Sequence, residues 1–173
     1  MRKQTGFSLI ELLIVVAIIL IIAAIAIPNL LQARLAANEA SATQGLHTLH
    51  VAEISYSTAY STIGYSNTLA ALGGAPPCTP AAATACLIDN LLASAAPGGA
   101  GKSGYYYQAT GVMTGGALYN TAYVVGAAPI SVNHTGNRDF CATNDGVLRS
   151  QMGNPGDLPA TTLAACMVYP VAQ

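Results

Sequence analysis

The segment that decides the fold runs from Phe7 to Ile27 and reads FSLIELLIVVAIILIIAAIAI. Nineteen of its 21 residues are apolar, and the two exceptions are Ser8 and Glu11. An α-helix rises about 1.5 Å per residue, so the segment reaches about 31 Å, which matches the hydrocarbon thickness of a bilayer, about 30 Å. We therefore predict one membrane-spanning helix.

The charges that flank this helix predict its orientation. Arg2 and Lys3 precede it, and Arg34 is the first charged residue after it. Because positive residues stay on the cytoplasmic side, we expect the remainder of the chain to be exported. A secretory signal peptide cleaved near Ala24-Ile25-Ala26 is the alternative. The apolar run exceeds the usual length of a signal peptide's hydrophobic region, about 7–15 residues, and contains an acid, so we favour an anchor that is retained.

The overall composition excludes several classes of function. Of the 173 residues, 53% are apolar and 8% are charged, and the net charge is −1. This balance lacks the basic surface of a nucleic-acid-binding protein, so no nucleic-acid partner is expected. The sequence also lacks a nucleophile elbow, a phosphate loop and a dinucleotide fingerprint. We predict neither catalysis nor a bound cofactor.

Glu11 is the most informative residue of the predicted membrane helix. A carboxylate in a membrane segment costs about 2.5–3.5 kcal/mol on insertion scales and is retained mainly where a partner compensates its charge. One interpretation is that Glu11 reaches the membrane surface near the helix N-terminus, where negative charge is favoured. The other is that a cation of another molecule pairs with it inside the apolar layer.

The second interpretation is supported by the sequence around Glu11, which reads Gly6-Phe7-Ser8-Leu9-Ile10-Glu11 after a short basic leader. With the apolar run as far as Pro28, this segment resembles the N-termini of type IV pilins and of the related pseudopilins of type II secretion. The resemblance implies that a membrane peptidase cuts after Gly6 and methylates Phe7. It also implies that Glu11 neutralises the amino terminus of a neighbouring subunit during assembly.

Beyond the membrane segment, the apolar spacing becomes one-sided, with separations of three, four or seven residues between Leu31, Leu35, Ala42, Leu46, Leu49, Tyr56 and Tyr60. This spacing predicts that an amphipathic helix continues to about Tyr60. Pro28 should kink or loosen this helix, although it is also a suitable first residue for a second helix. His47, His50 and Glu53 are interpreted as polar positions beside the apolar stripe, because their spacing is no known metal-site signature.

Residues 61–173 are expected to form an exported head, which gives an α+β fold with three parts: leader 1–6, helix 7–60 and head 61–173. A short helix should begin at Thr79-Pro80, and an irregular tail should follow Gln151. Asp139, Asp145 and Asp157 are interpreted as turn residues rather than Ca²⁺ ligands. Alternating patterns predict an antiparallel sheet whose strands are Tyr105 to Met113, Leu118 to Ala127, Arg138 to Thr143 and Gly146 to Gln151.

All four cysteines follow the anchor, so they are predicted to reach an oxidising compartment and to form disulfides. Three pairings are possible. We favour Cys78 with Cys86 and Cys141 with Cys166, since each pair joins neighbours in the sequence. A zinc site is the alternative, but the chain has no Cys-x-x-Cys motif.

These features predict a structural subunit of a bacterial type IV pilus. Before assembly, the protein would be held by lipid in the inner membrane with its head outside, and afterwards it would form part of an extracellular homo-oligomeric filament. The partners implied by the resemblance are a prepilin peptidase and methyltransferase and an assembly platform in the inner membrane. Two alternatives stay open, a pseudopilin of type II secretion and a membrane-tethered binding module.

Overall fold

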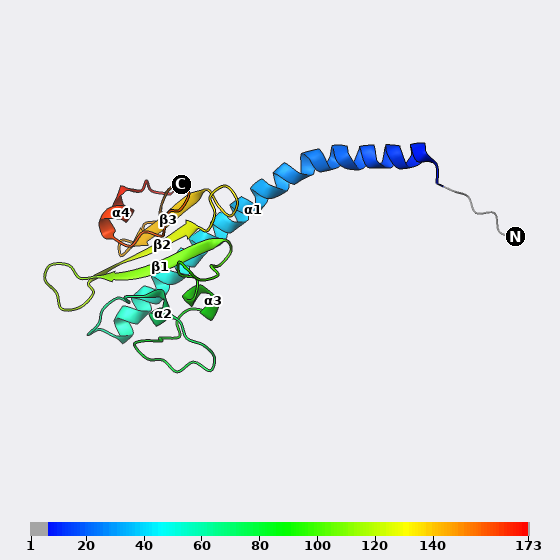
Figure 1. Ribbon diagram of the computed structural model, residues 1–173. Coiled ribbons are helices and arrows are strands. Elements are labelled where there is room, and N and C mark those ends of the chain that lie inside the picture. Colours follow the sequence, from blue (N-terminus) through cyan, green and yellow to red (C-terminus); the bar gives the residue numbers. More distant parts are fainter. Residues whose placement is uncertain (1–6, 173) are drawn as a thin grey trace. The chain divides into compact units, whose positions relative to one another are not determined.

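The computed structural model describes residues 7–172 and shows one long helix followed by a mixed head (Figure 1). The chain divides into two compact units between Arg34 and Leu35. The elements, in chain order, are α1 (Leu9–Ala59), α2 (Leu69–Leu72), α3 (Asn90–Ala93), β1 (Tyr105–Val112), β2 (Ala122–Pro129), β3 (Arg138–Thr143), β4 (Arg149–Met152) and α4 (Leu163–Val168).

Helix α1 confirms the predicted long helix, because its 51 residues are continuous from Leu9 to Ala59. Pro28 lies inside it, so the alternative in which this proline starts a second helix is wrong. Proline has no N–H to donate, and the carbonyl of Ala24 therefore lacks its usual partner four residues on. The kink expected at Pro28 stays a prediction.

Within the second unit, one face of α1 supplies a large part of the head's core. Leu35, Ala42, Leu46, Leu49 and Tyr56 are buried, as the one-sided spacing predicts. Burial of each large side chain contributes about 1.5–3 kcal/mol relative to exposure, so this stripe accounts for much of the attachment of the helix to the sheet.

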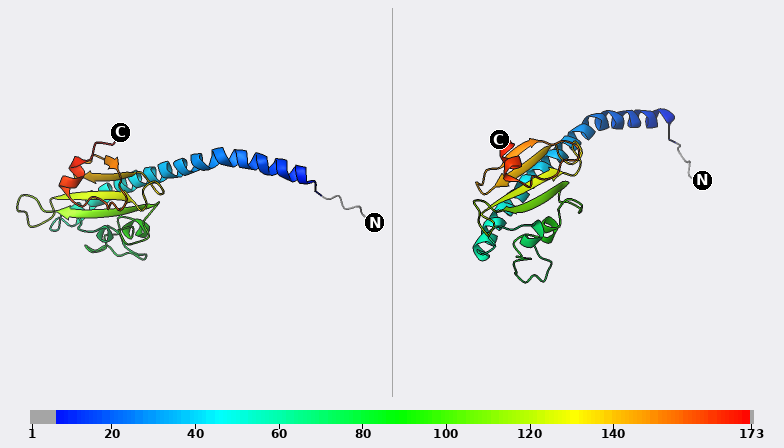
Figure 2. Two further views of the ribbon diagram at one scale, coloured as in Figure 1. Left: turned by 45° about the horizontal axis from the view of Figure 1, so that its top comes forward. Right: turned by 60° about the vertical axis from the view of Figure 1, so that its left-hand side comes forward.

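The four strands form one antiparallel sheet in the order β1-β2-β3-β4. All eight residues of β2 are buried, because both faces of the sheet are covered. Tyr123, Val125 and Ala127 face the core that α1 shares, whereas Val124 belongs to a second cluster with Cys141 and Cys166. Helix α4 packs against β2 and β3 (Figure 2). The sheet is thus the middle layer of the head.

Two predictions about the head are wrong. The short helix begins after Asp89, whose side chain accepts a hydrogen bond from the backbone N–H of Leu92, and not at Thr79-Pro80. The segment after Pro80 instead forms a tight turn in which Ala81 and Thr84 exchange backbone hydrogen bonds. The tail after Gln151 is also not wholly irregular, since it contains α4, which is capped by Thr162.

Candidate functional site

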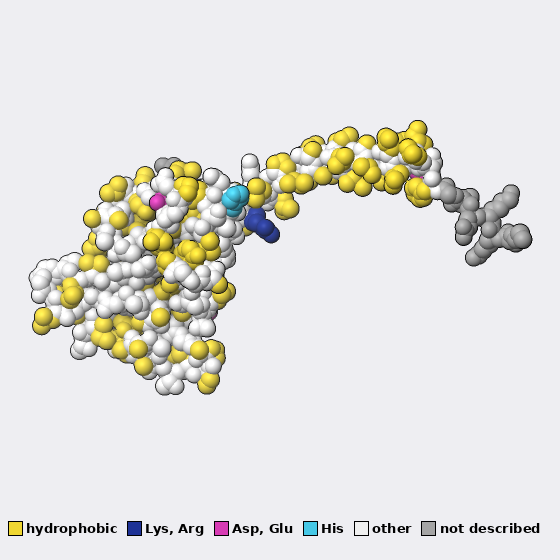
Figure 3. Space-filling view, viewed as in Figure 1, with side chains coloured by type: hydrophobic (Ala, Val, Ile, Leu, Met, Phe, Trp, Pro, Cys, Tyr) yellow, Lys and Arg dark blue, Asp and Glu magenta, His cyan; other side chains and the backbone are white. Residues whose placement is uncertain are grey.

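The first candidate site is the surface of α1 in the first unit. Here α1 is long and apolar enough to span a membrane, and none of the residues in its most apolar window is buried by the described chain. Figure 3 shows this part of the helix as a nearly unbroken hydrophobic surface. The exposed fractions of Ile10, Leu20 and Ile21 are 65%, 63% and 65%. An apolar surface of this extent requires lipid or another protein to cover it.

Glu11 is the acidic residue of the first turn of α1 and is exposed on this surface. Within residues 7–172, the ion pairs are Lys102–Asp89, Arg138–Glu39 and Arg149–Asp145, so Glu11 has no cationic partner in the described part of the chain. Phe7 lies four positions before it and is 78% exposed. Gly6, the predicted cleavage position, lies outside the described residues. The Glu11 carboxylate is therefore exposed and without an ion pair among residues 7–172.

The head contains a second acidic group, Glu53, which the sequence interpretation placed beside the apolar stripe. That interpretation is wrong, because Glu53 is fully buried and its two carboxylate oxygens accept hydrogen bonds from the backbone N–H and the hydroxyl of Ser66, at 2.8 and 2.6 Å. Burial raises the pKa of Glu53 to about 7, against the lowering effect of Ser66. Its role in the described chain is to join α1 to the following loop.

Next to Glu53, His50 is half-buried and forms a hydrogen bond through Nδ1 with the hydroxyl of Tyr123 on β2. His47 is exposed, and both histidines line a cavity of about 330 Å³ between α1 and the β3–β4 hairpin. In residues 7–172, no three of the His, Cys, Asp and Glu side chains are grouped so as to hold a metal ion. Of the two histidines, His50 joins α1 to β2 through its hydrogen bond with Tyr123.

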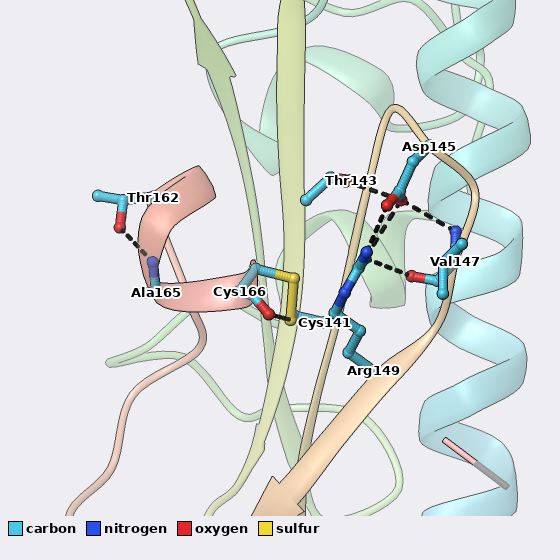
Figure 4. The surroundings of a disulfide bond; sticks show 8 residues. All are labelled: Cys141, Thr143, Asp145, Val147, Arg149, Thr162, Ala165 and Cys166. Carbon is cyan, nitrogen blue, oxygen red and sulfur yellow. Dashed lines mark hydrogen bonds and ion pairs between the residues drawn. A yellow bond between two sulfur atoms is a disulfide. The ribbon is translucent and has the colours of Figure 1, made fainter. Parts of the chain in front are cut away.

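The cysteines form the two favoured pairs, Cys78–Cys86 and Cys141–Cys166, and no free cysteine is found in the described chain. The second pair joins β3 to α4 (Figure 4). Beside it, Asp145 occupies the predicted hairpin turn, where it pairs with Arg149 at 2.5 Å and accepts a hydrogen bond from the N–H of Val147. The hydrogen bond from Arg149 holds the pKa of Asp145 far below its usual range.

The three aspartates considered as turn residues have different surroundings. Asp145 and Asp157 lie in turns, and Asp157 accepts a hydrogen bond from the N–H of Asn154 at 2.7 Å. Asp139 is instead in the middle of the sheet, on β3, and is 1% exposed. The interpretation of Asp139 as a turn residue is therefore wrong. Asp139 could have been recognised as a strand residue from its position within the alternating strand pattern.

Together, the described features define a class of protein: a subunit with an apolar N-terminal helix, an acid in its first turn, and a disulfide-bonded α+β head. Residues 1–27 match the family model of the prokaryotic N-terminal methylation motif. The N-terminal segment of the chain thus carries a prepilin-type motif and is similar to that of type IV pilins.

A curated relative supports the same class. The chain is 60% identical over 47 residues to the type IV wide pilus major component PilA4 of Thermus thermophilus. The match covers 27% of this chain and 36% of that protein, so it spans only about a third of the relative's length. No solved structure matches the chain.

Proposed function

We propose that this chain is a structural subunit of a bacterial type IV pilus, in which the α1 helices of many copies pack together. The proposal is carried by one observation, the exposed apolar surface of α1 on which Glu11 has no cationic partner among residues 7–172. A single copy leaves this surface uncovered, whereas lipid before assembly and neighbouring helices afterwards would each cover it.

The proposed chemistry of assembly is charge neutralisation. A peptidase that cuts between Gly6 and Phe7 frees an ammonium group on Phe7, which a methyltransferase then methylates. Glu11 of one subunit accepts this cation from an adjacent subunit in the water-free helix bundle. Removal of one member of a buried ion pair typically costs about 3–5 kcal/mol, so the pair would fix the axial register of the helices as well as their affinity.

The proposed location changes with assembly. The subunit is held in the inner membrane with its head outside, is delivered to an assembly platform there, and ends in an extracellular filament. The name of the Thermus relative, a wide pilus major component, favours a pilus over the pseudopilus of a type II secretion machine. We assign the head no catalytic role, and a binding function of a solitary tethered head is the remaining alternative.

Two measurements test the proposal. Mass spectrometry of subunits from sheared surface fibres should find a chain that begins at a methylated Phe7, whereas an intact leader would contradict it. In cells, Glu11→Ala and Glu11→Gln should leave the protein in the membrane but strongly reduce its share in fibres. Ser8→Ala, which alters the other polar residue of the segment, is the matched control and should assemble normally.

A further inference from the structure

Asp139 is a buried acid that the assembly proposal does not use. It lies on β3 with 1% of its surface exposed, and neither carboxylate oxygen receives a hydrogen bond from the described residues. By contrast, Asp89, Asp145 and Asp157 each accept hydrogen bonds from backbone N–H groups. A buried ionised carboxylate without donors is strongly disfavoured, so Asp139 requires either a proton or a bound positive charge.

The groups that face Asp139 are acids, phenols and other acceptors. Asp157, in the loop after β4, is a neighbouring acid that raises the pKa of Asp139, and the phenols of Tyr105 on β1 and Tyr169 after α4 are the other titratable neighbours. Arg138, the adjacent cation, is paired with Glu39. The oxygen Oδ1 of Asn137 is also buried without a donor.

Gln151 and Gly153 are two further neighbours of the Asp139 carboxylate. Gln151 is the cross-strand partner of Asp139 on β4, and its side chain favours the ionised form, but this effect is weaker than that of burial. Gly153 lies so close that a β-carbon there would be 2.9 Å from Oδ1 of Asp139. The loop backbone therefore closes over the acid and leaves little room for water.

We propose that Asp139 is protonated in the folded head and donates this proton to Asp157, so that one shared proton fastens residues 153–157 to strand β3. The proton transfers from solvent to Asp139 on folding, and no covalent bond forms or breaks. The interaction does not depend on filament assembly, because all of its members lie in one head.

The titration of the two acids is consistent with this arrangement. Burial raises the pKa of Asp139 to about 7, whereas the hydrogen bond from the N–H of Asn154 lowers the pKa of Asp157. Asp139 therefore keeps the proton and Asp157 keeps the negative charge, which is the division expected when two neighbouring carboxyl groups share one proton.

The position of the pair gives it a structural consequence. Asp139 and Cys141 are two residues apart on β3 and so lie on the same face of the sheet. Two interactions then hold the C-terminal segment on this face. One is a disulfide, which is independent of pH, and the other is the proton of Asp139, which is lost as the pH rises. Above about pH 7, loss of the proton should loosen residues 153–157 while Cys141–Cys166 keeps α4 in place.

The sign of the pH dependence follows from the raised pKa. The unfolded chain loses the proton near the ordinary aspartate pKa of 3.8, and the folded head retains it to a pKa of about 7. The stabilising effect is complete below about pH 4, decreases as the pH rises to about 7, and is absent above that pH. One such proton changes the folding equilibrium constant by up to about tenfold per pH unit within this window.

The test uses the full chain in detergent micelles at pH 5, 6, 7 and 8. Hydrogen–deuterium exchange of residues 153–157, expressed as protection factors, is measured together with the folding equilibrium constant. The wild type should lose protection in this loop between pH 6 and 8. Asp139→Asn should retain the protection of this loop at pH 8, because an amide donates to Asp157 at every pH. The folding equilibrium constant of this variant should also lack the wild type's change of up to about tenfold per pH unit.

Two further variants complete the test. Asp89→Asn, which keeps a suitable N-cap on α3, should leave the pH dependence as in the wild type. Asp157→Asn should keep the loop protected from pH 5 to pH 8, because its amide accepts from the protonated form of Asp139 and donates to the ionised form. This variant keeps the test decisive if Asp139→Asn does not fold.

Three results would overturn the shared proton. The first is equal pH dependence of the wild type and Asp139→Asn, and the second is loss of loop protection between pH 6 and 8 in Asp157→Asn. The third is protection of the wild-type loop at pH 8 that increases with calcium chloride and decreases with EDTA, because the same oxygens would then hold a cation.

Discussion

Glu53 and Ser66 form a buried link between α1 and the loop that leads to α2. The carboxylate accepts the backbone N–H of Ser66 at 2.8 Å and its hydroxyl at 2.6 Å, and both residues are 0% exposed. Each carboxylate oxygen therefore has a donor, which compensates part of the cost of burying an acid. The oxygens of Asp139 have no donor among residues 7–172, so the head contains two kinds of buried acid.

Replacement of Ser66 by alanine should destabilise the head more at high pH than at low pH. Because the pKa of Glu53 is raised to about 7, the group is ionised at pH 8 and protonated at pH 5, and only the ionised form depends strongly on the hydroxyl donor. We expect a loss of about 1–3 kcal/mol at pH 8 and a smaller loss at pH 5. Urea unfolding at pH 5 and at pH 8 measures the two losses of stability.

The matched control for this prediction is Ser57→Ala, because Ser57 is also on α1 but its hydroxyl donates to the backbone carbonyl of Ile54 near the surface. It should change stability little and equally at both pH values. Equal losses for Ser66→Ala at pH 5 and pH 8 would show that Glu53 does not depend on the hydroxyl when ionised.

Gly45 should not tolerate alanine, although alanine favours helices. A β-carbon at this buried position of α1 would lie 2.7 Å from Cε1 and 3.0 Å from the hydroxyl oxygen of Tyr107, whose ring is fully buried. The helix-propensity gain of about 1 kcal/mol is outweighed by an overpacking cost of about 1–3 kcal/mol. Thermal unfolding should show a lower midpoint for Gly45→Ala and little change for Gln44→Ala, its exposed neighbour.

Two tyrosines of β1 should respond differently to replacement by phenylalanine. Both are fully buried, but the hydroxyl of Tyr105 donates to the carbonyl of Arg138 at 3.0 Å, whereas that of Tyr107 has no partner in the part of the chain that the structure describes. Tyr105→Phe should cost about 1 kcal/mol, and Tyr107→Phe should be neutral or stabilising. Equal losses in chemical denaturation would mean that Tyr107 also has a hydrogen-bond partner in solution.

The two disulfides should contribute unequally to stability. Cys141–Cys166 closes a separation of 25 residues and Cys78–Cys86 one of 8. In the chain-entropy account, these loops correspond to about 3.5 and about 2.5 kcal/mol. Replacement of each pair by alanine, followed by denaturant unfolding, should find the larger loss for the first pair. A larger loss for Cys78–Cys86 would mean that the disulfides act mainly on the folded state and not by restricting the unfolded chain.

The sequence was sufficient for the long elements. The unbroken apolar run and the one-sided spacing predicted α1, and strand β3 lies where the alternating pattern places it, from Arg138 to Thr143. Such patterns are reliable because one face of a helix or strand must enter the core. The export argument that predicted the anchor also predicted disulfides, and the pairing followed from the proximity of the cysteines in the sequence.

The shorter helices were harder to predict, because helices of four to six residues contain too few turns to show a period. Their caps, Asp89 and Thr162, are the usable signals. Glu53 and Asp139 were misjudged because charged residues are normally exposed. Glu53 nevertheless falls within the spacing that runs from Leu49 to Tyr56, so the periodic pattern itself marks its burial.

The central claim is that Glu11 is neutralised by the amino terminus of another subunit. Cryo-electron microscopy of the purified fibre, at a resolution that shows side chains, tests it most directly. We predict that each Glu11 carboxylate lies within about 4 Å of the Phe7 nitrogen of a neighbouring subunit, as an ion pair requires. A fibre in which Glu11 faces lipid or water without a cation, or in which Gly6 still precedes Phe7, would contradict the account.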